Sequence, residues 1–299
     1  MSESILIAGT GALACLFAAR LAAAGGRVAM LGTWPEGLRA LQQHSVRLVQ
    51  DDAERAYPVR ATDSPAECAG SEHALALVKS WQTGRAAAQL AECLAPDGIA
   101  LTLQNGLGNR EILADALGPE RVALGITTTG ATLLAPGRVR PGGAGVISVE
   151  VHPRLNPIIA MLREAGFTVE TTPSASSLVW SKLVINAAIN PLTALLRVPN
   201  GDLLERPTAR ALMGELAREA AAVAAAQGIP LTFPNPVAAA EDVARRTATN
   251  HASMFQDVQR GAPTEIDAIC GAIVWAGEEN GVETPMNWAM WQLVKAVIG

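Results

Sequence analysis

The sequence is poor in the side chains that mark several common protein classes. Aromatic residues make up 4% of the 299 residues and charged residues 17%, and no stretch concentrates Lys and Arg. Non-specific nucleic-acid binding depends on clustered cations that displace counterions, so the absence of such a stretch argues against a nucleic-acid partner. The net charge of −5 still allows a small anionic ligand, because a few cations inside a cleft outweigh the overall balance.

Cysteine is also scarce, and no two cysteines form a Cys-x-x-Cys pair. This argues against a zinc ribbon, a thioredoxin-type site and a disulfide framework, and no cluster of His, Cys and acidic residues indicates a metal. Buried thiols in a reducing cytosol are the simpler interpretation. The four cysteines are Cys15, Cys68, Cys93 and Cys270.

Neither a targeting segment nor a membrane span is expected. Residues 1–5 include Glu3 and lead directly into a strand, which predicts no signal peptide. Polar residues such as Arg20, Asn186 and Asn190 interrupt the longest apolar runs too often for a membrane helix. We therefore expect a cytoplasmic protein.

The first half of the chain alternates strand and helix patterns, which is typical of a parallel sheet with helices on both faces. From Gly130 to Val151, Pro-Gly pairs and alternating polarity predict antiparallel strands that close the sheet. A helix over 155–165 and a strand over 167–170 are expected to complete the domain. The other elements predicted here are strands at 4–9, 27–31, 74–78, 99–103 and 122–126, and a helix at 13–24.

Beyond the polar stretch 171–177, strand patterns nearly disappear. Helices are expected at 178–196, 207–227, 235–247, 265–280 and 285–298. The sequence therefore predicts a mostly parallel α/β domain of the Rossmann type over residues 1–173 and an all-α domain over residues 174–299. A length of 299 residues suits two domains.

A glycine-rich motif, Gly-x-Gly-x-x-Ala, lies directly between the first strand and the first helix. Gly9 permits a tight turn, Gly11 lets the backbone approach a pyrophosphate, and Ala14 lets the helix pack closely on the strand. The helix N-terminus then offers free N–H groups to phosphates. A purely structural turn is the alternative, but the position after the first strand favours dinucleotide binding by Gly9, Thr10, Gly11, Ala12, Leu13 and Ala14.

The end of the second strand bears on which dinucleotide is bound. NAD enzymes usually carry an acid there for the ribose 2′-hydroxyl, whereas this strand runs into Gly32, Thr33 and Trp34. A missing carboxylate favours NADP (NADPH) over NAD, which stays open because no arginine follows the strand either. Thr33 can donate a hydrogen bond there, and Arg39 is the nearby candidate cation.

Polar residues follow two later strands at the edge where such sheets bind ligands. Lys79, in the segment Lys-Ser-Trp-Gln that ends at Gln82, can neutralise a cofactor phosphate, or it can be a solvated lysine at a strand end. Asn105 can hold a carboxamide or a substrate oxygen, although Asn105-Gly106 is also a common turn dipeptide.

The strongest pattern lies in the first long helix of the second half. Lys182, Asn186 and Asn190 recur every four residues and therefore share one face of an apolar helix. Asn disfavours helix, so an ordinary solvated face is a weaker explanation than a face chosen for hydrogen bonding. Pro191 is expected to kink this helix or end its first half. Asn200-Gly201 then reads as a turn that places one more amide.

A last polar segment runs from Ser253 to Asp267. Thr264 to Asp267 precede an apolar run, so helix capping is the plain interpretation of Glu265 or Asp267. Gly261 and Pro263 separate Ser253 from this region and exclude one straight helix. Alone, the segment does not indicate chemistry.

Taken together, these segments resemble the ketopantoate reductase family across nearly the whole chain. The lysine–asparagine helix combined with Ser-Met-x-Gln-Asp and Thr-Glu-Ile-Asp is the specific part; the glycines alone are not. The resembling segments are 9–14, 79–82, 104–106, 127–140, 180–196, 199–201 and 253–267.

This resemblance implies NADPH-dependent reduction of 2-dehydropantoate to pantoate, a step toward coenzyme A. It implies a helical domain like the C-terminal domain of 6-phosphogluconate dehydrogenase. Lys182 is similar to the family's catalytic lysine, and Glu265 to a glutamate near the substrate and the cofactor. Lys79 and Gln82 are similar to cofactor contacts, and the resemblance assigns pocket roles to Asn105, Asn186, Asn190, Asn200 and Ser253. The family often has Arg where this chain has Thr33.

Three functions stay open at this point. The leading one is a reductase of a small anionic 2-oxo acid, in which Lys182 faces the nicotinamide ring and stabilises or protonates the developing alkoxide. A reductase of another small carbonyl or imine, and a non-catalytic NAD(P)-sensing protein, are the alternatives. A homodimer is compatible with the helical half, because dimers are the commonest closed assembly.

Overall fold

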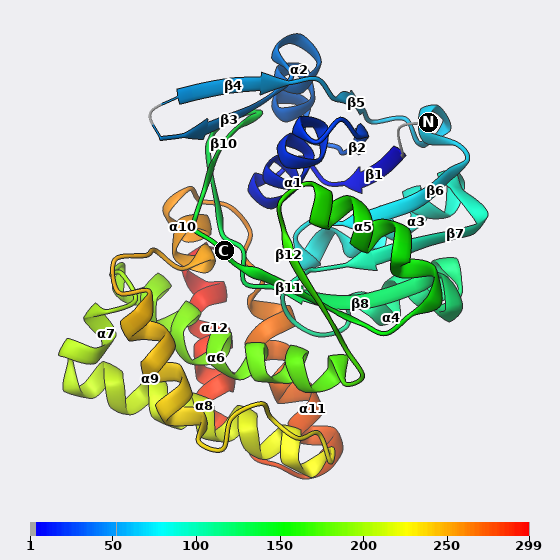
Figure 1. Cartoon of the computed structure of the whole chain (residues 1–299). Helices are drawn as coiled ribbons and strands as arrows, with labels where there is room; N and C mark the ends of the chain where they lie inside the picture. The colour runs from blue at the N-terminus through cyan, green and yellow to red at the C-terminus, as the bar shows by residue number, and fades with distance from the viewer. Residues whose placement is uncertain (1–3, 52, 299) are drawn as a thin grey trace. The chain divides into compact units, whose positions relative to one another are not determined.

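The structure, a computed structural model, describes residues 4–51 and 53–298 (Figure 1). Its internal contacts divide the chain into two compact units. The first runs to Gln104 and resumes over Asn109–Ala175, and the second comprises Asn105–Gly108 and the chain from Ser176 onward. Glu3, on which the expectation about a signal peptide rests, lies outside the described residues.

The first unit is built on a mostly parallel sheet of eight strands in the order β12-β11-β8-β7-β6-β1-β2-β5. Only the pairing of β11 with β8 is antiparallel. The chain order reverses between β1 and β6, so the carboxyl ends of these strands form the switch point at which such sheets bind ligands. The strands are β1 (Ser4–Ala8), β2 (Arg27–Leu31), β5 (Arg60–Thr62), β6 (Ser71–Ala76), β7 (Leu94–Thr102), β8 (Val122–Thr127), β11 (Val146–Glu150) and β12 (Thr168–Thr172).

Helices cover both faces of this sheet (Figure 1). Successive side chains of a strand point to opposite faces, so Ile5 and Ile7 of β1 pack in one core with α1 and α5, while Leu6 and Ala8 pack in another with α3 and α4. The α helices of the unit are α1 (Ala12–Ala23), α2 (Pro35–His44), α3 (Thr83–Cys93), α4 (Asn109–Leu117) and α5 (Asn156–Glu164), with short 3-10 turns η1 (Pro65–Cys68), η2 (Ser80–Gln82), η3 (Pro119–Arg121) and η4 (Pro153–Leu155).

The prediction for residues 130–151 was partly wrong. Of the strands found there, only β11 joins the main sheet. The other two belong to a separate four-stranded sheet in the order β4-β3-β10-β9, which packs on α1. Its strands are β3 (Val46–Gln50), β4 (Ala53–Tyr57), β9 (Ala131–Ala135) and β10 (Arg138–Pro141). Apolar side chains of these strands, such as Val46, Leu48 and Val139, are buried against α1 in the first of the two cores.

Apart from the segment 105–108, the regular elements in the described part of the second unit are all helices, joined by loops. Helix α8 packs against α7, α9, α11 and α12, and the small side chains Ala217, Ala220 and Ala224 are buried along it. Many small residues let helix axes approach closely, which explains how an aromatic-poor sequence still fills a core. The elements are α6 (Ala175–Leu196), α7 (Asp202–Glu205), α8 (Pro207–Ala226), α9 (Pro236–Arg246), α10 (Ser253–Gln259), η5 (Asp267–Gly271), α11 (Ala272–Asn280) and α12 (Pro285–Ile298).

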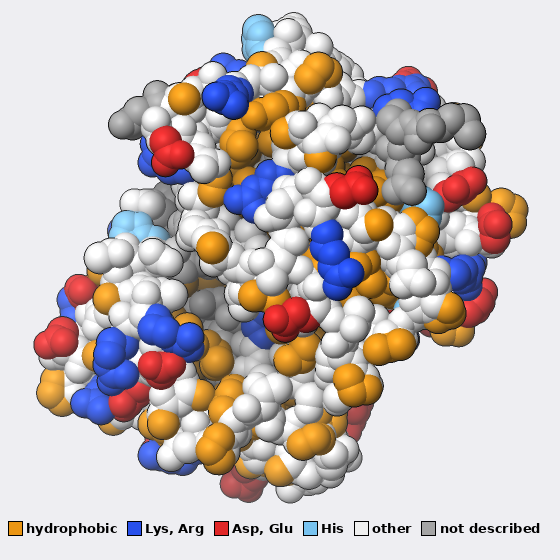
Figure 2. Space-filling model, viewed as in Figure 1, with side chains coloured by type: hydrophobic (Ala, Val, Ile, Leu, Met, Phe, Trp, Pro, Cys, Tyr) orange, Lys and Arg blue, Asp and Glu red, His pale blue; other side chains and the backbone are white. Residues whose placement is uncertain are grey.

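Charged groups mark the outside of this unit and one of its helix ends. Figure 2 shows cationic and anionic side chains intermixed in the region of α7 and α9. Arg210 of α8 binds Glu241 of α9. Glu219 accepts hydrogen bonds from the backbone N–H groups of Met286 and Asn287 at 2.8 and 2.9 Å. That carboxylate therefore caps the N-terminus of α12, a favourable place for negative charge.

Helix α6 does not end at Pro191, as one form of the prediction had it, but continues to Leu196. It is the one helix in the described part of the chain that is long and apolar enough to cross a membrane by length and composition. Since 67% of that stretch is buried within the protein, it is also what the core helix of a globular unit looks like.

Candidate active site

The glycine-rich loop has the geometry that its motif predicted. Gly9 has φ +133°, and a Cβ there would lie 3.0 Å from the carbonyl oxygen of Leu77 at the end of β6. Gly11 has ordinary backbone angles, and a Cβ on it would meet nothing within 4 Å. Gly9 is therefore required by the protein's own packing, whereas Gly11 keeps a space open.

The loop ends at a helix N-terminus that no side chain occupies. Gly11 is the N-cap of α1, it makes no side-chain cap hydrogen bond, and the first turn contains no acidic residue. Ala14 is fully buried against the sheet, while Ala12 and Leu13 are partly exposed. Free N–H groups beside open space suit a pyrophosphate, so these residues fit a bound dinucleotide.

The end of β2 touches this loop directly. The backbone N–H of Gly9 donates to the carbonyl of Leu31 at 2.8 Å, and a Cβ on Gly32 would lie 2.6 Å from Cγ2 of Thr10. Thr33, the next residue, accepts a hydrogen bond at Oγ1 from Nη1 of Arg85 at 3.1 Å.

Arg39, the cation suggested by sequence, is engaged elsewhere. Its Nε donates to the carbonyl of Pro35 at 3.3 Å, and its Nη2 lies 3.7 Å from a carboxylate oxygen of Glu36. Both partners belong to its own helix, α2. The idea that Arg39 serves the end of β2 therefore gains no support from the structure.

Lys79 and Gln82 follow β6 on the other side of β1, and both are partly buried. Gln104, at the end of the neighbouring β7, fastens this region: its Nε2 donates to the carbonyl of Val78 at 3.0 Å and to Oγ1 of Thr83 at 2.8 Å. The first turn of α3 is therefore fixed to two strand ends, and Lys79 and Gln82 follow the carboxyl end of β6, where the switch point lies.

In the second unit, the polar face of α6 is largely withdrawn from solvent. Lys182 and Asn186 are partly buried and Asn190 is 7% exposed, which contradicts an ordinary solvated face. Burial lowers the pKa of Lys182 to about 8, and the nearby charge of Glu265 opposes this by favouring the ammonium form. A lysine with a pKa near 8 is still mostly protonated at neutral pH and gives up its proton far more readily than a solvated one.

Glu265 is 5% exposed, and it is held by a loop distant in sequence. Nδ2 of Asn105 donates to Oε2 of Glu265 at 3.1 Å. Gly106 has φ +84°, a Cβ on it would lie 2.6 Å from that of Ala268, and the N–H of Leu107 donates to the carbonyl of Ala268 at 2.9 Å. Asn-Gly is thus more than a turn: the glycine allows close docking that brings Asn105 to Glu265.

The helix after Glu265 begins as the π-helical segment η5. Asp267 there accepts hydrogen bonds from Nε1 of Trp291 at 2.6 Å and Nζ of Lys295 at 3.2 Å. The two acids therefore separate in role. Asp267 ties η5 to α12, while Glu265 is directed to Asn105 and close enough to Lys182 to influence its charge. Single π-helical turns often lie at functional sites because they redirect side chains.

Asn200 and Ser253 lie on neighbouring segments of the second unit. The N–H groups of Asn200 and Gly201 donate to the carbonyls of Asn250 and Ala248, each at 3.0 Å, and Ser253 begins α10. Nδ2 of Asn200 donates to Oγ1 of Thr247 at 2.8 Å, which itself donates to a backbone carbonyl. Oδ1 of Asn200 is buried without a hydrogen-bond partner in the described chain. Such an acceptor is costly unless a ligand donates to it.

Other chemistries find less support. All four cysteines are buried, and burial raises their pKa values, that of Cys15 to about 12, so they are poor nucleophiles. The residues that the structure describes contain no group of three or more side chains arranged to hold a metal.

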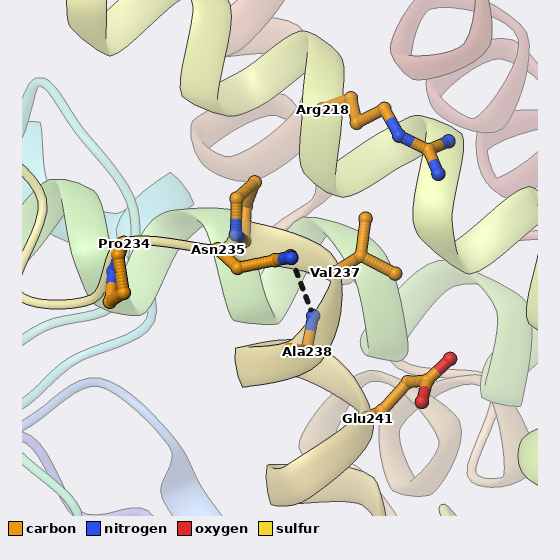
Figure 3. A pocket seen from close by; sticks show the side chains of 7 residues that line it. Arg218, Pro234, Asn235, Val237, Ala238 and Glu241 are labelled. Carbon is orange, nitrogen blue, oxygen red and sulfur yellow. Dashed lines mark hydrogen bonds between the residues drawn. The ribbon is translucent and has the colours of Figure 1, made fainter.

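An open hollow of about 470 Å³ lies beside α9, and Figure 3 shows the side chains that line it. Its polar groups are already engaged: Asn235 accepts from the N–H of Ala238, Glu241 binds Arg210, and Arg218 binds Glu215. None of the predicted site residues lines it.

The structure thus groups the predicted residues within each unit. The glycine loop, Thr33, Lys79 and Gln82 surround the switch point of the sheet, and Lys182, Glu265 and Asn105 gather in the helical unit. Sequence analysis missed Arg85 and the docking of the loop 105–108 on η5. A glycine at position 106, beside the amide of Asn105, indicated a close approach of the loop, but its docking partner η5 is distant in sequence. A dinucleotide cradle suits a nicotinamide cofactor and a partly buried lysine of lowered pKa suits proton transfer, so the residues of the two units fit a nicotinamide-dependent oxidoreductase.

Comparisons with known proteins agree with this class. The family model "Ketopantoate reductase PanE/ApbA" matches residues 5–154, and the model of its C-terminal domain matches residues 175–298. The chain is 34% identical over 300 residues to the 2-dehydropantoate 2-reductase of Halobacterium salinarum, covering 97% of both chains. It is 34% identical over 306 residues to that of Archaeoglobus fulgidus, covering 99% of this chain and 98% of the relative.

Solved structures give the same result. A PanE/ApbA family ketopantoate reductase from Ralstonia eutropha superposes with a TM-score of 0.91 at 31% identity, covering 99% of this chain and 98% of that one. A D-mandelate dehydrogenase with NADH and anilino(oxo)acetate superposes with a TM-score of 0.93 at 26% identity and the same coverage. The chain is an oxidoreductase and belongs to the ketopantoate reductase family, which confirms the resemblance and the predicted fold class.

Proposed function

We propose that this protein reduces 2-dehydropantoate to pantoate with NADPH, in the cytoplasm and on the route to coenzyme A. The observation that carries the proposal is the group formed by Lys182, Glu265 and Asn105: a partly buried lysine with a pKa of about 8, a buried carboxylate that acts on its charge, and an amide bonded to that carboxylate. The names of the full-length relatives support the substrate.

The side chains divide the chemistry as follows. A bound reduced nicotinamide supplies the hydride that becomes bonded to the substrate's keto carbon. Negative charge then develops on the carbonyl oxygen, where the ammonium of Lys182 donates a hydrogen bond and finally transfers its proton, giving the hydroxyl of the product. Glu265 favours the protonated lysine beforehand, and Asn105 fixes the direction of the Glu265 carboxylate.

Asn200 supports the choice among 2-oxo acids. Its Oδ1 is a buried acceptor without a partner among the described residues, and 2-dehydropantoate carries a terminal hydroxyl that can donate to it. A site built to bond a substrate hydroxyl strongly rejects an analogue that lacks it, because the buried acceptor is then left unpaired.

NADPH oxidation with purified protein tests the proposal. We expect turnover with 2-dehydropantoate, and a kcat/KM at least about 100-fold lower for the same acid without its terminal hydroxyl. Phenylglyoxylate, the oxo acid that corresponds to mandelate, is the comparison substrate suggested by the solved relative. Higher kcat/KM with phenylglyoxylate would contradict the assigned substrate, and cofactor binding without turnover of any carbonyl would favour a sensor.

A further inference from the structure

The position at which a protein of this fold distinguishes NADP from NAD can be located within the first unit. In this fold the residue after the second strand faces the ribose 2′ position. Here that strand is β2, and it is tied to the phosphate-binding loop through Gly9 and Leu31 and through the packing of Gly32 on Thr10. The 2′ group of a dinucleotide bound on this loop is therefore expected beside Thr33.

A cation reaches this place from a distant part of the chain. Nη1 of Arg85 donates to Oγ1 of Thr33 at 3.1 Å across a separation of 52 residues. Arg85 extends from the first turn of α3, which follows β6 on the other side of β1. Thr83, two residues earlier, is fully buried and bonded to Gln104, so the base of the arginine is held in place.

The charge of Arg85 is not neutralised by an acid among the described residues, unlike the charges of two other arginines in the first unit. Arg39 on α2 lies against Glu36, and Arg60 on β5 binds Glu67 at 2.8 Å. In the described chain, the guanidinium of Arg85 donates to the neutral hydroxyl of Thr33, and this guanidinium pairs with no carboxylate. Since β2 also ends without an acid, the site combines an uncompensated cation with a hydroxyl.

We propose that Arg85 and Thr33 together bind the 2′-phosphate of NADP and that Arg85 determines the preference over NAD. A guanidinium presents several N–H donors in a fixed fork that suits phosphate oxygens, and the Thr33 hydroxyl adds a neutral donor. The inference rests on the proposed use of NADPH. It explains how the chain recognises that phosphate without an arginine directly after β2.

Binding measured by calorimetry tests the inference without turnover. Wild type, Arg85→Ala, Arg85→Lys and the control Arg39→Ala are each titrated with NADPH, with NADH, and with the fragments 2′,5′-ADP and 5′-AMP. Arg85→Ala is expected to lose about 10- to 100-fold in affinity for NADPH and 2′,5′-ADP, with little change for NADH and 5′-AMP. Arg85→Lys is expected to lose less, because it keeps the charge but not the fork. Arg39→Ala is expected to behave like wild type.

Three results would overturn the inference: unchanged NADPH affinity in Arg85→Ala, equal losses for NADPH and NADH, or loss of NADPH affinity in Arg39→Ala. The reductase assay keeps this apart from the proposed function. If the wild type reduces 2-dehydropantoate with NADPH while Arg85→Ala binds NADPH normally, only the role of Arg85 fails. If the wild type turns over only with NADH, the proposed cofactor fails and Arg85 with it.

Discussion

The two units build their polar sites from different materials. In the first, the phosphate cradle consists of consecutive backbone groups between β1 and α1, and Gly9 and Gly11 shape it by lacking side chains. In the second, Lys182, Asn105 and Glu265 come from three segments far apart in the chain. A backbone site tolerates side-chain changes that keep its glycines, whereas a side-chain site depends on the packing that brings its members together.

This contrast explains why burial and pH affect the site of the second unit more than the phosphate cradle of the first. The helix N-terminus attracts anions through fixed backbone dipoles, which do not change with pH near neutrality. Lys182 works through a proton, and its pKa of about 8 results from burial, which lowers it against the opposing charge of Glu265. The chemistry of the second unit is therefore the part that pH and packing can disturb.

The largest stability effect is expected where the loop 105–108 docks on η5. Gly106→Ala would combine strain at φ +84° with a clash against Ala268, and we expect it to lower the free energy of unfolding by about 3 kcal/mol. Gly108 has a similar φ of +85° but open space around its Cβ, so Gly108→Ala is the matched control at about 1 kcal/mol. Urea unfolding measures both, and equal losses would show that docking contributes nothing.

A comparison within the glycine loop is expected to give opposite outcomes. Gly9→Ala meets the Leu77 carbonyl at an unfavourable φ and should lower stability by about 1–3 kcal/mol. Gly11→Ala meets no protein atom and should fold normally, yet weaken NADPH binding by roughly 10-fold or more, because its methyl group enters the space left for the pyrophosphate. Thermal melts and cofactor titration separate the two, and full NADPH affinity in Gly11→Ala would place the phosphates elsewhere.

The smallest effect is a shift in the pH dependence of kcat. Lys182 must carry its proton to donate it, so the wild-type rate is expected to fall as pH rises through about 8. Glu265 favours the charged lysine, so Glu265→Gln should move this alkaline limb to lower pH. Asp267→Asn removes a carboxylate that bonds Trp291 and Lys295 instead, and it should leave the limb in place. An unmoved limb in Glu265→Gln would separate Glu265 from the charge of Lys182.

The sequence predicted the parts of the fold that depend on local pattern. Patterns among consecutive residues predict the glycine loop, the apolar core strands and the long helices. The hairpin of β3 and β4 was missed because β4 is almost wholly exposed and has no apolar alternation to reveal it. The placement of β9 and β10 in a second sheet was missed because strand pairing between distant segments leaves no local trace.

The same limit applies to the candidate site. Lys182, Asn186 and Asn190 could be grouped from sequence because a helix repeats every four residues or so on one face. The bond from Arg85 to Thr33 and the docking of Gly106 on Ala268 join residues that are distant in the chain. No residue spacing predicts such contacts, and the π-helical start of η5 has no distinct composition either.

The division of labour between a backbone cradle and a partly buried lysine is tested most directly by single-turnover NADPH oxidation in Lys182→Met, with the enzyme in excess over NADPH and 2-dehydropantoate saturating. Methionine keeps a similar length and apolar packing but has no proton to give. The account predicts unchanged NADPH affinity and a rate of hydride transfer lower by about 100- to 10,000-fold. A variant that reduces the substrate as fast as the wild type would contradict it.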